Sequence, residues 1–191
     1  MVARFLLASQ SPRRRELLRD AGFAFEVIAS SMNEISSRHL SVRELTLANA
    51  MRKACSFAAD ANAVVLGADT LVACDGEIIG KPRDLDEARE ILQRLSGRAH
   101  DVCTGVCLAR AGVAQISFAE FSSVRFKRLS DSAITAYFAT INPLDKAGAY
   151  AAQGDGRVII EKITGSISNV IGLPLASTTR ALARCGIMPA R

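Results

Sequence analysis

The stretch that decides the fold of this chain is residues 63–79, AVVLGADTLVACDGEII. It begins with a continuous apolar run, Ala63 to Ala68, which is typical of a strand covered on both faces of a sheet. Asp69 and Thr70 follow this run directly, so we expect them at or near the end of that strand. Ligand crevices in open α/β sheets form at strand ends, and the sequence therefore predicts a polar site at this point.

The second half of the same stretch predicts a β-hairpin. Two short runs suited to strands, 71–74 and 77–79, flank the dipeptide Asp75-Gly76. Asp-Gly favours the tight two-residue turn that joins antiparallel strands. We therefore expect an antiparallel pair directly after the buried strand.

Helix signals surround this stretch on both sides. Ser11-Pro12 and the capping-box pair Ser41 and Glu44 mark two helix starts on its N-terminal side. The expected strands cover residues 4–8, 23–28, 63–68, 71–74, 77–79, 100–109, 115–127 and 157–163, and the expected helices cover about 12–22, 41–60, 84–97, 130–140 and 174–186. Alternating strands and helices followed by strand pairs predict one α/β domain over residues 1–191, in which helices flank a mixed β-sheet.

Composition excludes several classes of protein. With 49 % hydrophobic and 23 % charged residues, the chain has the balance of a globular domain and not that of a disordered segment. It contains no run of about 18 apolar residues, and its apolar start leads into an Arg-rich stretch instead of a cleavage site, so we expect a cytoplasmic protein. The net charge of +5 suits an anionic partner without choosing among nucleic acid, acidic lipid and small phosphorylated ligands.

The cysteines and histidines carry no convincing site. The five cysteines are odd in number and include no C-x-x-C pair, which argues against a disulfide framework and a thiolate zinc site. We expect reduced, mostly packed thiols, with Cys103 and Cys107 on one face of a strand. We interpret His39 and His100 as surface or cap residues.

Two segments have residues suited to phosphate. Residues 9–14, SQSPRR, place two hydroxyls and two guanidiniums at a helix N-terminus, where free backbone N–H groups favour anions. An N-cap with solvated arginines explains the same residues equally well. Lys81, in the tripeptide GKP, can reach a phosphate as a compact cation, although such a lysine is usually an ordinary loop residue.

Other polar segments leave similar alternatives open. Asp69 can act as a base toward water or hold Mg²⁺, or it can simply cap a turn. Residues 145–150, DKAGAY, with QGDG at 153–156 and NVIGLP at 169–174, form glycine-punctuated loops that let backbone approach a ligand. Each of these loops taken singly is also compatible with ordinary turn chemistry.

Taken together and in this order, these segments resemble the Maf family of nucleoside triphosphate pyrophosphatases. The resemblance runs from Leu7 to about Leu182, through ASQSPRR, GADT, GKP, LSGR, DKAGAYAAQG and NVIGLPL. The DKAGAY and QG elements resemble the branch that hydrolyses dTTP and UTP. The sister branch acts on N7-methyl-GTP.

The resemblance implies hydrolysis between the α- and β-phosphates of a nucleotide with a divalent metal, Mg²⁺ or Mn²⁺. It implies a mixed α/β fold similar to that of ITPases, with two lobes around a deep cleft, often as a homodimer. The family is thought to clear surplus or non-standard nucleotides, with a link to restraint of cell division. In this sequence the implied residues are Asp69 as proton acceptor, Glu34 at an acidic metal-site position, Lys81 and Lys146 facing phosphate, and Arg13, Thr70 and Gln153 at specificity positions.

The full candidate site combines both lines of argument. Its catalytic candidates are Asp69, Lys81 and Glu34, of which Glu34 and Asp69 are also the candidate metal ligands. The candidates for substrate binding and specificity are Ser9, Ser11, Arg13, Arg14, Thr70, Lys146 and Gln153.

Two positions depart from the family pattern. Asn33 precedes Glu34 where relatives often carry a second acid, and Asn142 precedes Pro143 where they usually carry Glu. At both positions this sequence has an amide in place of an acid.

Two alternatives stay open besides the dTTP and UTP reading. One is the sister-branch activity on N7-methyl-GTP, and the other is a regulator of cell division that binds nucleotide or nucleic acid without turnover. The acids Glu34, Asp69 and Asp145 argue against a nucleic-acid partner, because unneutralised carboxylates repel a phosphate backbone. We expect a nucleoside triphosphate as the partner, with neither membrane nor nucleic acid.

Overall fold

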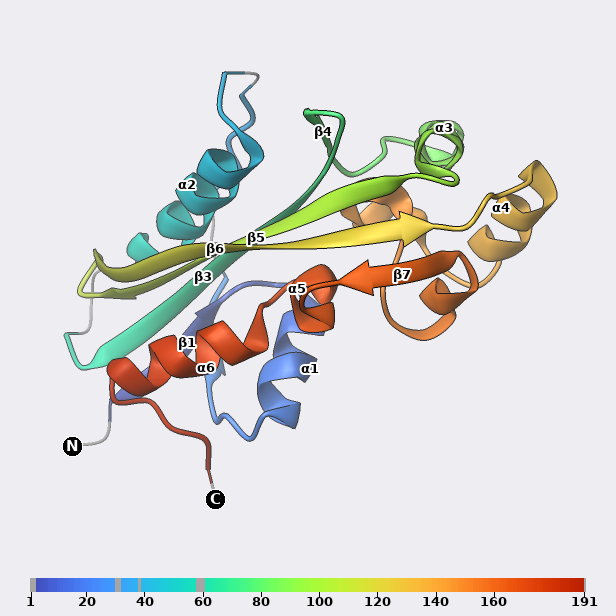
Figure 1. Cartoon of the computed structure of the whole chain (residues 1–191). Helices are drawn as coiled ribbons and strands as arrows, with labels where there is room; N and C mark the ends of the chain where they lie inside the picture. The colour runs from blue at the N-terminus through green and yellow to red at the C-terminus, as the bar shows by residue number, and fades with distance from the viewer. Residues whose placement is uncertain (1–2, 30–31, 38, 58–60, 191) are drawn as a thin grey trace. The chain divides into compact units, whose positions relative to one another are not determined.

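The computed structural model describes residues 3–29, 32–37, 39–57 and 61–190 (Figure 1). Within this part of the chain, seven strands form one sheet in the order β2-β1-β3-β5-β6-β7, and β4 pairs with β3. The strands are β1 (Arg4–Ala8), β2 (Glu26–Val27), β3 (Ala63–Cys74), β4 (Glu77–Ile79), β5 (Ala99–Arg110), β6 (Val113–Phe126) and β7 (Ile160–Thr164). The α-helices are α1 (Pro12–Asp20), α2 (Val42–Cys55), α3 (Leu85–Leu95), α4 (Asp131–Phe138), α5 (Ile167–Ile171) and α6 (Leu175–Arg184), and the short 3₁₀ helices are η1 (Pro143–Asp145), η2 (Ala147–Ala149) and η3 (Gly154–Val158).

The sheet is mixed, as the sequence predicts. Strand β1 runs parallel to both β2 and β3, whereas β3 is antiparallel to β4 and β6 is antiparallel to β7. The chain divides into two compact units. Unit 1 comprises Met1–Thr70, Thr104–Glu120 and Gly172–Arg191, and unit 2 comprises Leu71–Cys103 and Phe121–Ile171. The predicted cleft between two lobes stays a prediction.

In unit 1 the parallel strands are covered on both faces. Helix α2 lies on one side of β3, and α1 and α6 lie on the other (Figure 1). Leu7 of β1 and Leu66 of β3 are opposite each other in register and are fully buried. The apolar run of 63–68 is thus a strand covered on both faces, as predicted.

Helix α2 packs directly against backbone. A Cβ added to Gly67 would lie 2.3 Å from the Ala50 carbonyl oxygen, and one added to Gly105 of β5 would lie 2.5 Å from that of Thr46. Glycine at these two positions therefore allows the helix to approach β3 and β5 more closely than any side chain would permit. The capping box of Ser41 and Glu44 is formed and fixes where this helix begins.

The hairpin of unit 2 also forms as predicted. Asp75 and Gly76 both have positive φ, 52° and 80°, as the tight turn favoured by Asp-Gly requires. Beyond the turn, α3 begins after Asp84, whose side chain accepts the Glu87 amide at 2.8 Å. The core of unit 2 lies among the hairpin, α3, α4 and the central strands, and includes Val72, Leu92, Val124, Phe126, Ile134 and Tyr150.

The prediction that the strand beginning at Ala63 ends at or near Asp69 and Thr70 is wrong. Asp69 and Thr70 lie inside β3, which continues to Cys74. The pairing changes instead: the parallel ladder with β1 ends at Ala8 opposite Gly67, and the antiparallel ladder with β4 begins at Val72. Asp69 therefore follows the end of the β1–β3 ladder without being at the end of the strand.

Several other boundaries differ from those expected. Strand β2 has only two residues, because it pairs only with Leu6 and Leu7 of β1. Helix α2 ends at Cys55, and its expected end at Asp60 lies outside the described residues. Strand β7 begins at Ile160, since η3 precedes it.

The outcome for the expected thiols and histidines is mixed. The cysteines are free, and Cys103 and Cys107 are fully buried, as predicted. His39 is exposed, but His100 is only 3 % exposed, so its interpretation as a surface or cap residue is wrong. Among the described residues, no helix is both long and apolar enough to cross a membrane.

Candidate functional site

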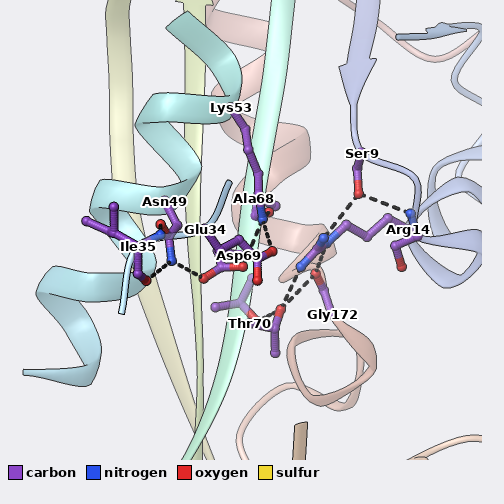
Figure 2. A network of polar contacts seen from close by, with 12 residues as sticks. Ser9, Arg14, Glu34, Ile35, Asn49, Lys53, Ala68, Asp69, Thr70 and Gly172 are labelled. Atoms are coloured by element: carbon purple, nitrogen blue, oxygen red, sulfur yellow. Dashed lines mark hydrogen bonds and ion pairs between the residues drawn. The ribbon is translucent and has the colours of Figure 1, made fainter. Parts of the chain in front are cut away.

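The predicted site residues fall into both units. Unit 1 contains Ser9, Ser11, Arg13, Arg14, Glu34, Asp69 and Thr70, and unit 2 contains Lys81, Lys146 and Gln153. Because side chains alternate along a strand, Asp69 and Thr70 point to opposite faces of β3. Two separate polar groups form around them, one beside α2 and one beside α1 (Figure 2).

The group beside α2 is built around the carboxylate of Asp69. Only 4 % of this residue is exposed. Its Oδ1 accepts a hydrogen bond from Lys53 Nζ at 2.9 Å, and its Oδ2 accepts one from Asn49 Nδ2 at 3.0 Å. Burial of an ionised carboxylate is tolerated only when such partners are present. Both oxygens of Asp69 are therefore held in place by donors from α2.

Lys53 also binds the second predicted acid. Its Nζ donates to Glu34 Oε1 at 2.6 Å and to the Ala68 carbonyl oxygen at 3.3 Å. The Lys53 side chain is 11 % exposed, whereas that of Glu34 is 51 % exposed. One ammonium group thus joins a buried carboxylate to one that faces solvent.

Asn49 fixes the segment that carries Glu34. Its Oδ1 accepts the Ile35 amide at 2.8 Å, and its Nδ2 donates to the Ile35 carbonyl oxygen at 3.2 Å (Figure 2). This segment forms neither helix nor strand. The two hydrogen bonds from Asn49 to the Ile35 backbone therefore replace the backbone hydrogen bonds that a neighbouring strand would supply. Asn49 therefore positions both Asp69 and the backbone next to Glu34.

Asn49 and Lys53 are functional candidates that the sequence reasoning missed. They lie four residues apart on one helix face, in line with buried Leu45. The available signal was the pair of polar residues at positions 49 and 53, which follow Leu45 at intervals of four residues. The same spacing of polar residues is usual on solvated helix faces.

The group beside α1 is built around Arg14, which is 9 % exposed. Its Nε donates to the Gly172 carbonyl oxygen at 2.8 Å, its Nη1 to Ser9 Oγ at 3.1 Å, and its Nη2 to Thr70 Oγ1 at 3.0 Å. Burial lowers the pKa of this guanidinium, and the carboxylates of Asp69 and Glu34 oppose that shift. Arg14 thus connects α1 to β3 and to the chain before α6.

The start of α1 presents the other predicted phosphate-binding groups. Ser9 Oγ accepts the Ser11 amide at 3.3 Å as well as the Arg14 bond. Ser11 occupies the N-cap position and Pro12 the first turn, but the Ser11 side chain makes no capping bond. Its hydroxyl and the helix N-terminus are therefore available to an anion, together with half-buried Arg13.

In unit 2 the structure brings together the loops of two predicted lysines. The Gly148 amide donates to the Gly80 carbonyl oxygen at 3.0 Å, so the loop carrying Lys146 lies against the loop carrying Lys81. Lys146 Nζ donates to the Asn142 carbonyl oxygen at 2.9 Å and is ion-paired with Asp145. Lys81 and Gln153 are exposed.

The described residues contain no cluster of three or more His, Cys, Asp or Glu side chains that could hold a metal. Glu34 and Asp69 are nevertheless joined through one ammonium nitrogen. Mg²⁺ usually takes only one or two carboxylates from a protein and completes its shell with water and substrate phosphate. The two acids therefore fit a divalent cation that is shared with a phosphorylated ligand.

Comparison with known proteins finds relatives that match nearly the whole chain. A family model described as Maf-like protein matches residues 4–185. A dTTP/UTP pyrophosphatase of Anaeromyxobacter dehalogenans is 46 % identical over 97 % of this chain and 96 % of its own, and one of Bacillus velezensis is 45 % identical over 95 % and 96 %. A solved structure titled as a nucleoside-triphosphatase / dITP/XTP pyrophosphatase, from Mycobacterium abscessus, covers 95 % of this chain and 97 % of its own at 14 % identity with a TM-score of 0.46.

Proposed function

This chain belongs to the Maf family, and on that premise we propose that it hydrolyses dTTP and UTP to the monophosphate and pyrophosphate. The observation that carries the proposal is the buried Asp69 carboxylate, held at both oxygens beside the exposed Glu34. A water molecule that attacks a phosphate needs an oriented proton acceptor, and a fixed carboxylate supplies one. The names of the similar bacterial proteins support dTTP and UTP as substrates.

We assign the proton-accepting role to Asp69. Lys53 and Asn49 occupy one side of its carboxylate and restrict its rotation, so the group is oriented before substrate binds. Lys53 also keeps Asp69 compatible with burial by supplying a counter-charge. Glu34 and Lys81 complete the set of catalytic candidates.

Substrate contacts are proposed for the polar start of α1 and for three residues of unit 2. Ser9, Ser11 and Arg13 lie at or next to a helix N-terminus, which favours the charge of a triphosphate. Arg14 acts mainly by holding this helix start in place, because protein acceptors already occupy its Nε and one N–H of each terminal nitrogen. Lys81 and Lys146 are proposed to face phosphate, and Thr70 and Gln153, with Arg13, to set base preference.

A divalent cation, Mg²⁺ or Mn²⁺, is part of the proposal. Glu34 and Asp69 would hold it, and the cation would neutralise charge that develops on the phosphate oxygens. Lys53 Nζ bonds to one oxygen of each carboxylate, so the cation would bind beside this ammonium group or displace it from one of the two acids. The exposed Glu34 is the acid that can turn more readily toward solvent. A cytoplasmic location and a homodimeric state stay predictions.

The test is pyrophosphate release from purified dTTP, UTP, CTP, GTP and N7-methyl-GTP with Mg²⁺ or Mn²⁺, with EDTA as the metal-free control. Asp69→Asn is the active-site variant. Asp75→Asn is its matched control, because it makes the same change in the exposed turn six positions further along the chain. We expect metal-dependent release from dTTP and UTP that Asp75→Asn retains and Asp69→Asn loses.

Other outcomes would change the proposal in different ways. Preference for N7-methyl-GTP would keep the reaction and replace the substrate with that of the sister branch. Nucleotide or oligonucleotide binding without release of pyrophosphate from any nucleotide would favour a non-catalytic regulator.

A further inference from the structure

A buried polar pair outside the catalytic groups lies in unit 2. His100 and Tyr150 are 3 % and 5 % exposed, and His100 Nε2 lies 2.9 Å from the Tyr150 hydroxyl. Phe126 packs edge-on against both rings, with ring centroids 4.8 Å from each. The three rings form a compact apolar cluster with a single internal hydrogen bond.

His100 makes this cluster less stable than an apolar residue at the same position would. Among the described residues, His100 Nδ1 is buried without a hydrogen-bond partner. An unsatisfied buried nitrogen is unfavourable, whereas a third phenyl ring would need no partner there. Burial lowers the pKa of His100 to about 4, so the ring is neutral at physiological pH and the bond joins two uncharged groups. The hydrogen bond to Tyr150 is therefore the property that distinguishes His100 from an apolar residue.

Tyr150 lies against the turn that carries Lys146. A Cβ on Gly148 would be 3.2 Å from the Tyr150 ring and 3.0 Å from Val72, so the turn is packed closely on both. Gly148 has φ +75°, and the next residue, Ala149, has φ +60° although it is not glycine. Such a conformation is unfavourable for alanine and persists only when its surroundings enforce it.

The same turn is joined to the loop of the second lysine. Gly148 N–H donates to the carbonyl oxygen of Gly80, the residue before Lys81. Rotation of the Tyr150 ring would remove its packing against Gly148, which supports the turn together with Val72 and the backbone bond to Gly80. Both lysine-bearing loops thus depend on where Tyr150 lies.

We propose that His100 is a positioning residue: through its hydrogen bond to Tyr150, it fixes the Gly148 turn against Gly80 and so sets the places of Lys146 and Lys81. The consequence for catalysis rests on the proposed function, in which these lysines bind the triphosphate. His100 acts through Tyr150 and not by contact with either lysine. Its effect is to restrict Tyr150 to one orientation.

The test compares substitutions that keep or remove this bond. Tyr150→Phe and His100→Phe remove it, whereas His100→Gln places a side-chain amide where Nε2 stood. His100→Asn, with a shorter amide, does not reach that position. Ile134→Val, in the core of the same unit, is the control for a general loss of stability.

Two readouts are needed. Hydrogen exchange of the Gly148 amide reports the turn directly and requires no activity; we expect it to accelerate about fivefold in the two Phe variants and in His100→Asn, and to stay near wild type in His100→Gln and Ile134→Val. The KM for dTTP should rise about fivefold in the same variants, because misplaced lysines weaken phosphate binding. Partial unfolding would instead lower the apparent kcat and leave KM unchanged. In a Lys146→Ala background, Tyr150→Phe should raise KM less than it does alone.

The outcomes separate the two proposals. Unchanged exchange at Gly148 in both Phe variants would overturn the positioning role. Faster exchange with an unchanged KM would show a purely structural pair and would also overturn it. A wild-type protein that releases no pyrophosphate would overturn the proposed function alone, and the exchange measurement would still decide whether His100 positions the turn.

Discussion

Lys53 Nζ lies 2.9 Å from Asp69 Oδ1, and the two side chains are only 11 % and 6 % exposed. This ion pair connects α2 to β3, and the close approach of the helix at Gly67 makes it geometrically accessible. The buried Asp69 carboxylate depends strongly on Lys53, because it would otherwise lose its counter-charge, whereas Lys53 without Asp69 would still be paired with Glu34 at 2.6 Å. The pair is therefore both a structural contact and the support of the proposed base.

Removal of the lysine should reveal this dependence. Lys53→Met keeps the apolar stem but leaves Asp69 as an uncompensated buried carboxylate, which should lower the free energy of unfolding by about 3 kcal/mol. Asp69→Asn in the Lys53→Met background should restore part of that loss, since it removes the remaining charge. Urea unfolding of the two single variants and the double variant measures the effect. Additive losses would show that the two side chains do not depend on each other.

Asp69→Asn alone should separate catalysis from folding. The variant keeps the size of the side chain but cannot accept a proton at neutral pH, so kcat for dTTP should fall by about 10²-fold or more. Thermal unfolding should shift only modestly, because one oxygen remains to accept from Lys53 or Asn49. Near-wild-type turnover in a folded variant would remove Asp69 from the proposed role.

The fold could be predicted where local signals agree with the final packing. The apolar run at 63–68, the Asp75-Gly76 turn and the Ser41 cap each act over a few residues, and the structure confirms all three. The strand at 71–74 was also expected, but its continuity with 63–68 through Asp69 and Thr70 could not be predicted in this way. A change of pairing partner, from β1 to β4, keeps a strand going without any mark in its own sequence.

The site could be predicted only in part, for a similar reason. Asp69 was expected from its motif and Glu34 from the family resemblance, but Asn49 and Lys53 were not expected, because a polar pair at i, i+4 usually faces solvent. Gly67 lets the helix lie close enough to bury them, and that contact joins residues distant in sequence. His100 was misjudged because its partner, Tyr150, is fifty positions away.

The adjacent arginines should respond differently to the same substitution. Arg14→Lys loses the planar guanidinium that donates hydrogen bonds to Gly172, Ser9 and Thr70. It should lower the free energy of unfolding by about 2 kcal/mol. Arg13→Lys should change stability by less than about 0.5 kcal/mol and alter the relative rates with dTTP, UTP and CTP. Unfolding curves and a nucleotide panel test both. An unchanged nucleotide profile in Arg13→Lys would count against its role in specificity.

The close packing of α2 predicts a sharp difference between two glycines. In Gly67→Ala the added methyl group would lie 2.3 Å from the Ala50 carbonyl oxygen and 2.6 Å from the Ala54 amide nitrogen, so the helix must move. We expect a loss of about 3 kcal/mol of unfolding free energy, with lower activity as Lys53 shifts. Gly80→Ala is the stability control, because nothing lies within 4 Å of its added methyl group. Equal stability of the two variants would contradict the packing argument.

His100 should make folding stability depend on pH in the mildly acidic range. Burial lowers its folded-state pKa from 6.5 to about 4, so the unfolded chain takes up the proton first as the pH falls. Its contribution to stability is complete above pH 6.5 and is lost progressively toward pH 4, to a total of roughly 3 kcal/mol. Other acids also titrate in this range, so the useful quantity is the difference between the wild type and His100→Gln, which keeps the bond to Tyr150 but has no proton to gain. Unfolding in urea at pH 7.5, 6, 5 and 4 should show the wild type losing stability relative to the variant at each step below pH 6.5. A constant difference across these pH values would mean that His100 is not held neutral in the folded protein.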